Sequence, residues 1–123
     1  MIHLDTNFLI DALVAGSAAE ARLVGWLTSG ETIGISAVAW GEFLCGPLSS
    51  SAEAAARRLL PDAEPMGRAD GELGAKFFNL TGRRSKSFAD CSIAAISVRS
   101  GASLATGNLP DFAPMVPHGL VLA

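Results

Sequence analysis

Short apolar runs alternate along the chain with longer segments in which apolar side chains recur every three or four residues. The first pattern is typical of buried strands and the second of helices with one apolar face. We expect strands at 2–4, 32–35, 103–106 and 120–122, and a turn or very short strand at 61–65. We expect helices at 6–15, 18–29, 37–45, 51–60, 68–81 and 87–100.

Strands that alternate with helices predict a parallel sheet covered on both faces. The expected fold is therefore α/β, with three layers and a central parallel sheet of about five short strands flanked by helices. In the second helix we expect Ala21, Val24 and Leu27 to face inward. We interpret Trp40 as part of the core, whereas Trp26 is the better candidate for an exposed contact.

The composition is typical of one small cytoplasmic domain, residues 1–123. Half of the residues are hydrophobic, but the chain contains no run of 18 or more apolar residues, so we expect no membrane span. The first residues lack the basic region and cleavage site of a signal peptide. Cys45 and Cys91 are too few for a disulfide framework or a structural zinc site, and we interpret both as small buried hydrophobes.

Four acidic residues each stand as the only side-chain charge in a long uncharged stretch, namely Asp5, Glu42, Asp90 and Asp111. A carboxylate among apolar neighbours loses hydration and is costly unless a cation or strong hydrogen-bond donors compensate for it. Because no isolated Lys or Arg matches these acids, they indicate a metal site. Oxygen ligands without clustered His or Cys favour a hard ion, Mg²⁺ or Mn²⁺, over Zn²⁺.

Each acid also has a purely structural explanation. Asp5 could cap the helix that follows it, and Asp90 could form a capping box with Ser87. Asp111 stands in an expected turn, where Asp is common for local reasons. Glu42 lies too deep in its helix to be a cap, and its neighbours are mostly apolar. A shared metal site explains all four acids together.

The net charge of −3 argues against a nucleic-acid partner, because phosphate binding requires Lys and Arg. Its distribution weakens that objection. Without the four isolated acids, the chain carries 9 basic and 8 acidic side chains. Arg83, Arg84 and Lys86 stand just before Asp90, where they could form a basic rim beside the acidic centre. A solvated charged loop explains these three residues equally well.

Four segments, residues 4–10, 35–42, 90–95 and 106–112, closely resemble the PIN-domain ribonucleases, and among them the toxins of bacterial VapC-type toxin–antitoxin pairs. The resemblance covers nearly the whole chain. It implies that Asp5, Glu42, Asp90 and Asp111 hold Mg²⁺ or Mn²⁺ for hydrolysis of RNA. It also implies that Asn108 supports the site, and that Thr6 and Asn7 orient Asp5 and bound water.

The resemblance further implies a homodimer, silenced by a cognate antitoxin in a heterotetramer or larger complex. Two other classes remain open from the residues alone. One is a PIN-like metal-binding or RNA-binding module without turnover, or a receiver-type regulator. The other is a metal-dependent phosphohydrolase of small phosphoesters, although the first strand gives Asp5-Thr6-Asn7 rather than Asp-x-Asp. A short overlapping upstream reading frame would favour a toxin.

Overall fold

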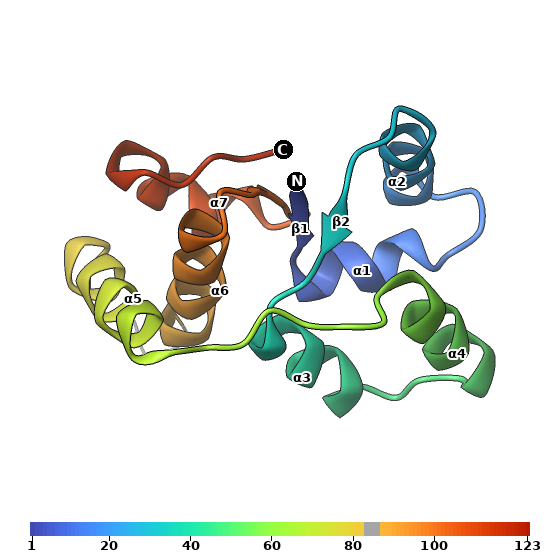
Figure 1. Cartoon of the computed structure of the whole chain (residues 1–123), viewed down its shortest axis with the longest axis horizontal. Helices are drawn as coiled ribbons and strands as arrows, with labels where there is room; N and C mark the ends of the chain where they lie inside the picture. Colours follow the sequence, from blue (N-terminus) through green and yellow to red (C-terminus); the bar gives the residue numbers. More distant parts are fainter. Residues whose placement is uncertain (83–86) are drawn as a thin grey trace.

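A parallel sheet of three short strands lies at the centre of the computed structural model, which describes residues 1–82 and 87–123 (Figure 1). The strands are β1 (Ile2–Leu4), β2 (Ile33–Gly34) and β3 (Ser103–Ala105), in the order β2-β1-β3. Ile2 pairs with Ile33 on one side and with Ser103 on the other. Since all three strands run in one direction, their carboxyl ends meet at the same edge of the sheet.

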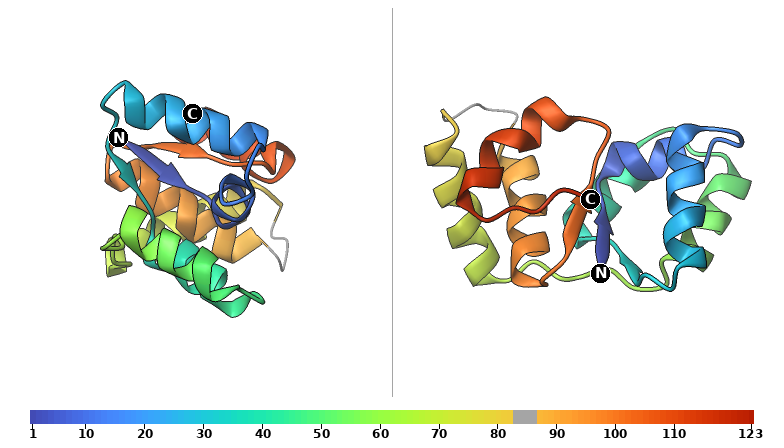
Figure 2. Two further views of the ribbon diagram at one scale, coloured as in Figure 1. Left: turned by 90° about the vertical axis from the view of Figure 1, so that its right-hand side faces the viewer. Right: turned by 90° about the horizontal axis from the view of Figure 1, so that it is seen from above.

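Helices cover both faces of this sheet, which confirms the predicted three-layer α/β architecture (Figures 1 and 2). Helices α1, α2 and α4 lie on one side, and α5, α6 and α7 on the other. No helix in the described part of the chain is long and apolar enough to cross a membrane. The helices are α1 (Thr6–Ala12), α2 (Ala18–Thr28), α3 (Ala37–Cys45), α4 (Ser50–Leu59), α5 (Arg68–Leu80), α6 (Ser87–Arg99), α7 (Leu109–Phe112) and the 3₁₀ helix η1 (Ala113–His118).

Two of the expected five strands are reduced to single bridges. Ser36 bridges to Glu64, and Leu104 bridges to Leu122, both in parallel. These bridges extend the sheet beyond β2 and β3, so the predicted segments occupy strand positions without forming ladders. The segment 61–65 begins and ends with proline, which has no N–H to donate to a ladder.

The core lies between the sheet and the two helical layers. Phe77 and Cys91 are fully buried, and Trp40 is half-buried against the core. The prediction for Cys45 was wrong: it is exposed at the last residue of α3. The largest buried side chains come from every layer, and they include Leu4, Leu9, Ile35, Phe43, Phe77, Ile93, Ile96, Leu104, Phe112 and Met115.

Helix α2 buries a different stripe from the one predicted. Val24 and Leu27 are 54% and 46% exposed, and Ala21 is also exposed, while Leu23 is buried. Trp26 is half-buried rather than free, because its ring packs against an aromatic side chain of α1. Apolar residues occur on several sides of this helix, so their spacing alone did not determine which side faces the core.

Candidate functional site

The polar residues that follow the three strands come together at the carboxyl edge of the sheet. Asp5 follows β1 directly, and Thr106 follows β3 directly. Ser36 stands two residues after β2, and its side chain caps α3. In parallel sheets this edge is where ligands bind. We therefore expect the functional side chains to lie at this edge.

Asp5 is buried at this edge, with 4% of its surface exposed. Its Oδ1 accepts a hydrogen bond from the Thr6 N–H at 2.8 Å, and its Oδ2 accepts one from the Thr106 hydroxyl at 2.8 Å. Asp5 is the N-cap of α1, as the structural explanation expected. Burial, with a smaller contribution from the charges of Glu42 and Asp111, nevertheless raises its pKa despite both hydrogen bonds. Asp5 is therefore both the N-cap of α1 and one of four acidic residues, Asp5, Glu42, Asp90 and Asp111, which we call the acidic cluster.

Glu42 approaches Asp5 through Thr6. The Thr6 hydroxyl donates to the Glu42 Oε1 at 3.0 Å, while the Thr6 N–H is bound to Asp5. The apolar neighbours of Glu42 suggested a buried side chain, and this was wrong: Glu42 is exposed. Helix α3 buries Ala39 and Phe43 and turns Glu42 to the outside.

Asp90 lies in the first turn of α6 and is half-buried. Its pKa is raised to about 6, first by burial and then by the charges of Asp5, Asp111 and Glu42. Each of the other three predicted acids therefore acts electrostatically on Asp90. The capping-box alternative depends on the side chain of Ser87, which lies outside the described side chains.

Asp111 is exposed in α7, a short helix where the sequence predicted a turn. The Asn108 side-chain amide donates to the Asp111 Oδ2 at 2.5 Å, and the Asn108 backbone N–H donates to the Thr106 hydroxyl at 2.9 Å. Thr106 thus connects Asp5 to the loop that carries Asp111. This role of Thr106 was not predicted, because Thr106 was expected to lie within the strand at 103–106.

The four carboxylates carry uncompensated charge. Within residues 1–82 and 87–123, no Lys, Arg or His side chain forms an ion pair with any of them. As placed, no three acidic, His or Cys side chains of this part of the chain lie close enough to share one metal ion. The donor set, oxygen only and in need of positive charge, nevertheless fits a hard divalent cation.

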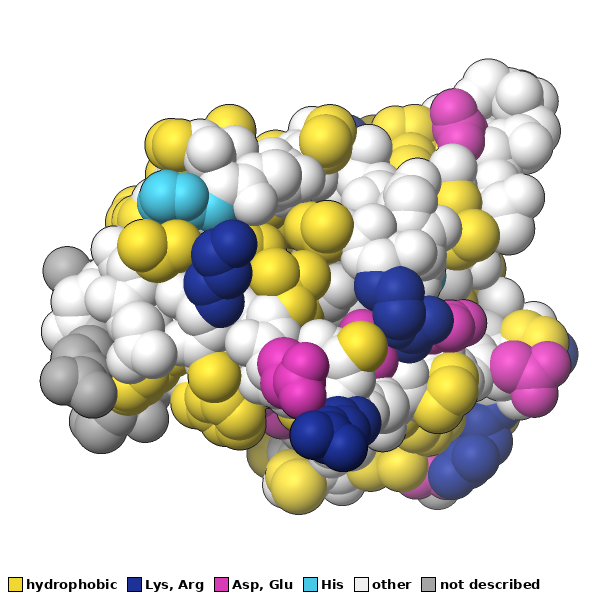
Figure 3. Space-filling view, turned by 60° about the vertical axis from the view of Figure 1, so that its left-hand side comes forward, with side chains coloured by type: hydrophobic (Ala, Val, Ile, Leu, Met, Phe, Trp, Pro, Cys, Tyr) yellow, Lys and Arg dark blue, Asp and Glu magenta, His cyan; other side chains and the backbone are white. Residues whose placement is uncertain are grey.

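Two other predictions concern residues around the cluster. Asn7 is exposed in the first turn of α1 and makes no side-chain hydrogen bond to another described residue. The basic rim predicted from Arg83, Arg84 and Lys86 lies outside the described residues. Among the described residues on the face that Figure 3 shows, basic and acidic side chains are interspersed among apolar ones.

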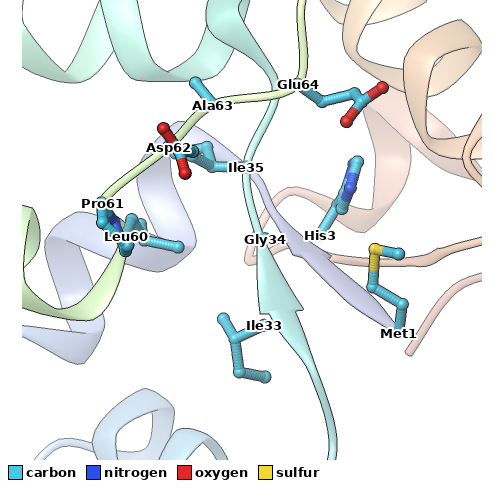
Figure 4. A pocket seen from close by; sticks show the side chains of 10 residues that line it. All are labelled: Met1, His3, Ile33, Gly34, Ile35, Leu60, Pro61, Asp62, Ala63 and Glu64. Atoms are coloured by element: carbon cyan, nitrogen blue, oxygen red, sulfur yellow. The ribbon is translucent and has the colours of Figure 1, made fainter.

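A separate cavity of about 230 Å³ lies beside β1 and β2 (Figure 4). Its lining includes His3, Gly34 and Glu64, and none of the four clustered carboxylates. Burial lowers the pKa of His3, and its Nδ1 has no hydrogen-bond partner among the described residues. A Cβ at Gly34 would come within 3.0 Å of the His3 ring, so glycine leaves room for the imidazole.

A family model of the PIN domain matches residues 2–109. The chain belongs to the PIN domain family. No curated protein gives a match, but several solved structures share the fold of this chain. VapBC2 from Rickettsia felis bound to a promoter DNA fragment has a TM-score of 0.76 at 18% identity, covering 100% of this chain and 98% of that one.

FitAcB from Neisseria gonorrhoeae has a TM-score of 0.72 at 22% identity, covering 100% of this PIN domain and 97% of that chain. VapC20 from Mycobacterium tuberculosis, a toxin that cleaves the sarcin–ricin loop, has a TM-score of 0.70 at 21% identity, with 100% and 98% covered. These similarities establish the PIN fold over the whole length of the chain.

Proposed function

We propose that this PIN domain is an Mg²⁺- or Mn²⁺-dependent endoribonuclease and the toxin of a type II toxin–antitoxin pair. The observation that carries the proposal is the set of hydrogen bonds through which Thr6 and Thr106 connect Asp5 to Glu42 and to the loop that carries Asp111. Burial first, and then the charges of these three acids, raise the pKa of Asp90 on α6 to about 6. Membership of the PIN domain family supports a nuclease.

The residues that would hold the ion are Asp5, Glu42, Asp90 and Asp111. Two carboxylates ~4 Å apart repel by about 4 kcal/mol at a surface-like effective dielectric, so a cluster of four favours a divalent cation. When bound, the ion would supply positive charge that lowers the pKa of a water and stabilises the charge that develops on a phosphodiester. Hydrolysis of this kind leaves a 5′-phosphate and a 3′-hydroxyl.

The chain's own residues orient the ligands. Asp5 is held at both oxygens, by Thr6 and Thr106, so its orientation is set before any ligand binds. Thr6 also holds Glu42, and Asn108 holds Asp111. Because Glu42 and Asp111 are exposed, their side chains can rotate toward a shared ion without disturbing the core.

Single-stranded or loop RNA is the proposed substrate. The open edge of the sheet leaves Asn7, Glu42 and Asp111 exposed, so a strand of RNA can reach the carboxylates from solvent. Asn7 follows Asp5 by two residues, and its unpaired amide can donate to a phosphate oxygen or to water. The sarcin–ricin loop, which VapC20 cleaves, is one RNA of this class to test.

An antitoxin is the proposed partner, in a heterotetramer or larger complex built on a homodimer. A mostly apolar groove of about 310 Å³ lies on α1, α3 and α4, lined among others by Ile10, Leu13, Val14, Phe43 and Leu48. We propose that an apolar helix of the antitoxin occupies this groove. VapBC2 and FitAcB, which share this fold, are named as two-component assemblies. Since α1 begins beside Asp5 and α3 carries Glu42, the bound segment can bring a basic residue to the carboxylates.

Cleavage of total cellular RNA by the purified protein tests the proposal. We expect cleavage with Mg²⁺ or Mn²⁺, products with 5′-phosphates, and no cleavage in EDTA. Asp5→Asn should lower the rate by about 100-fold or more while the fold survives. Asp62→Asn, at an exposed acid outside the cluster, should cleave like the wild type.

Other outcomes would replace the proposal. Undiminished cleavage in EDTA would contradict metal-dependent hydrolysis. RNA binding without cleavage in Mg²⁺ would favour a non-catalytic PIN-like module, and hydrolysis of small phosphoesters alone would favour a phosphohydrolase.

A further inference from the structure

Arg99, the last residue of α6, binds three groups on one neighbouring segment of the chain. Its Nε donates to the Asp70 Oδ1 at 2.6 Å, its Nη1 to the Glu64 Oε1 at 2.9 Å, and its Nη2 to the Pro65 carbonyl at 2.9 Å. A guanidinium is planar, so three bonds in different directions fix its position and orientation. The end of α6 is thus attached to residues 64–70.

Asp70 makes this attachment rigid. It is only 2% exposed, and its second oxygen accepts a hydrogen bond from the Gly67 N–H at 2.8 Å, at the start of α5. Although burial alone would raise it, hydrogen bonds from Arg99 and Gly67 hold the pKa of Asp70 below its usual value. The exposed pair Arg68–Glu72 on α5 lacks such a buried partner.

The other side of the same segment holds the start of α3. The Glu64 N–H donates to the Ile35 carbonyl at 2.8 Å, and the Ala37 N–H donates to the Glu64 carbonyl at 2.8 Å. Between them, Ser36 caps α3. Figure 4 shows residues 60–64 running beside β2 and Ile35, the residue that follows it. Glu64 therefore binds Arg99 through its side chain and the first turn of α3 through its backbone.

Through Glu64, the end of α6 is connected to the start of α3. Helix α6 carries Asp90, and helix α3 carries Glu42. Asp90 and Arg99 lie nine residues apart on α6, which is about 13 Å along a helix. If the end of α6 were released, a tilt of roughly 5° would move Asp90 by about 1 Å. Mg²⁺ requires near-octahedral ligands at about 2.1 Å, so a shift of this size is large for a metal site.

We propose that Arg99 is a positioning residue for the carboxylate cluster: by binding Asp70, Glu64 and Pro65 it sets the position of α6 against α3. The inference rests on the proposed metal-dependent function. Arg99 itself touches neither substrate nor ion. Its contribution is to hold α6, which carries Asp90, in a fixed position against α3, which carries Glu42.

Arg99→Gln tests the inference, with Arg68→Gln as the matched control because Arg68 also pairs with a carboxylate but is 93% exposed. Mg²⁺ affinity by calorimetry and RNA cleavage are measured at a temperature where circular dichroism shows every variant folded. For Arg99→Gln we expect Mg²⁺ binding and kcat each to fall by about 10-fold or more, with KM for RNA nearly unchanged. Arg99→Lys should recover part of the loss, and Arg68→Gln should bind Mg²⁺ like the wild type.

A role in stability alone predicts a different result. A folded Arg99→Gln protein with wild-type Mg²⁺ affinity and kcat, and only a lower melting temperature, would overturn the inference. If Arg99→Gln does not fold, Glu64→Ala decides, because it removes the side-chain oxygen that accepts from the Arg99 Nη1 and leaves the buried Asp70 paired. Weaker Mg²⁺ binding in Glu64→Ala supports the inference, and unchanged binding overturns it. A wild-type protein that binds no Mg²⁺ would instead overturn the proposed function, and the inference with it.

Discussion

The residues of the cluster could be found from the sequence because each is a lone charge in an uncharged stretch. The burial of each acidic side chain could not be predicted, because apolar neighbours in the sequence do not determine which side of a helix or strand faces water. Asp5 is buried directly after β1, whereas Glu42 is exposed on a helix with equally apolar neighbours. Thr106 escaped attention for a related reason: an uncharged hydroxyl in a sequence gives no sign that it binds a carboxylate 101 positions away.

The raised pKa of Asp90 predicts an unusual dependence of stability on pH. Its pKa is about 6 in the folded protein and close to 3.9 in an unfolded chain, so the folded state binds the proton more tightly. Without metal, the free energy of unfolding should therefore rise as the pH falls from 7.5 to 5, by on the order of 1 kcal/mol for a half-buried group. Thermal melts in EDTA across this range measure the effect.

Asp90→Asn provides the comparison for these melts. In Asp90→Asn, the free energy of unfolding should rise much less at low pH than it does in the wild type. At pH 7.5 without metal, the variant should be more stable than the wild type. The pH dependence that remains combines a rise from Asp5, whose pKa is raised, with an opposite contribution from His3, whose pKa is lowered. Equal pH dependence in both proteins would show that the pKa of Asp90 is not raised in the folded protein.

At the scale of elements, helix boundaries were predictable where local chemistry sets them. Ser36 caps α3, and Gly101 with a φ of 67° follows the end of α6. Helix α7 was missed because Pro110 was interpreted as part of a turn, yet proline also fits the first turn of a helix. Strand lengths depend on pairing with distant segments, which no local pattern reveals.

The groove on α1, α3 and α4 gives a prediction at this scale. Val14→Lys places a charge on the apolar groove, where it would be desolvated by an antitoxin helix, so the affinity should fall by about 10-fold or more. The control is Val121→Lys, because Val121 is 58% exposed outside the groove and Val14 is 57% exposed. Co-purification with the protein encoded by the adjacent short reading frame, followed by calorimetry, measures the difference. Equal affinities would place the partner on another surface.

At the scale of the whole molecule, alternation of strands and helices was sufficient to predict the layered parallel fold. The direction of the strands then brings Asp5 and Thr106 to one edge, and the position of Asp5 at this edge could be anticipated from the sequence. The separations among the four carboxylates could not, because they depend on how α3 and α6 pack. Contacts such as Arg99 with Glu64, 35 positions apart, determine that packing and leave no pattern in the sequence.

In the proposed site, the four carboxylates together bind a hard divalent cation. The most direct measurement is a titration of wild type and Glu42→Gln with Mg²⁺ and Mn²⁺ by calorimetry, with thermal melts at each concentration. Glu42 is the decisive residue because it is exposed, lies on α3, and contacts the cluster only through Thr6 in the described structure. If the four carboxylates share an ion, the wild-type melting temperature should rise with the logarithm of metal concentration over Kd, and binding should be at least ~10-fold weaker in Glu42→Gln. Equal binding and equal stabilisation in the two proteins would contradict it.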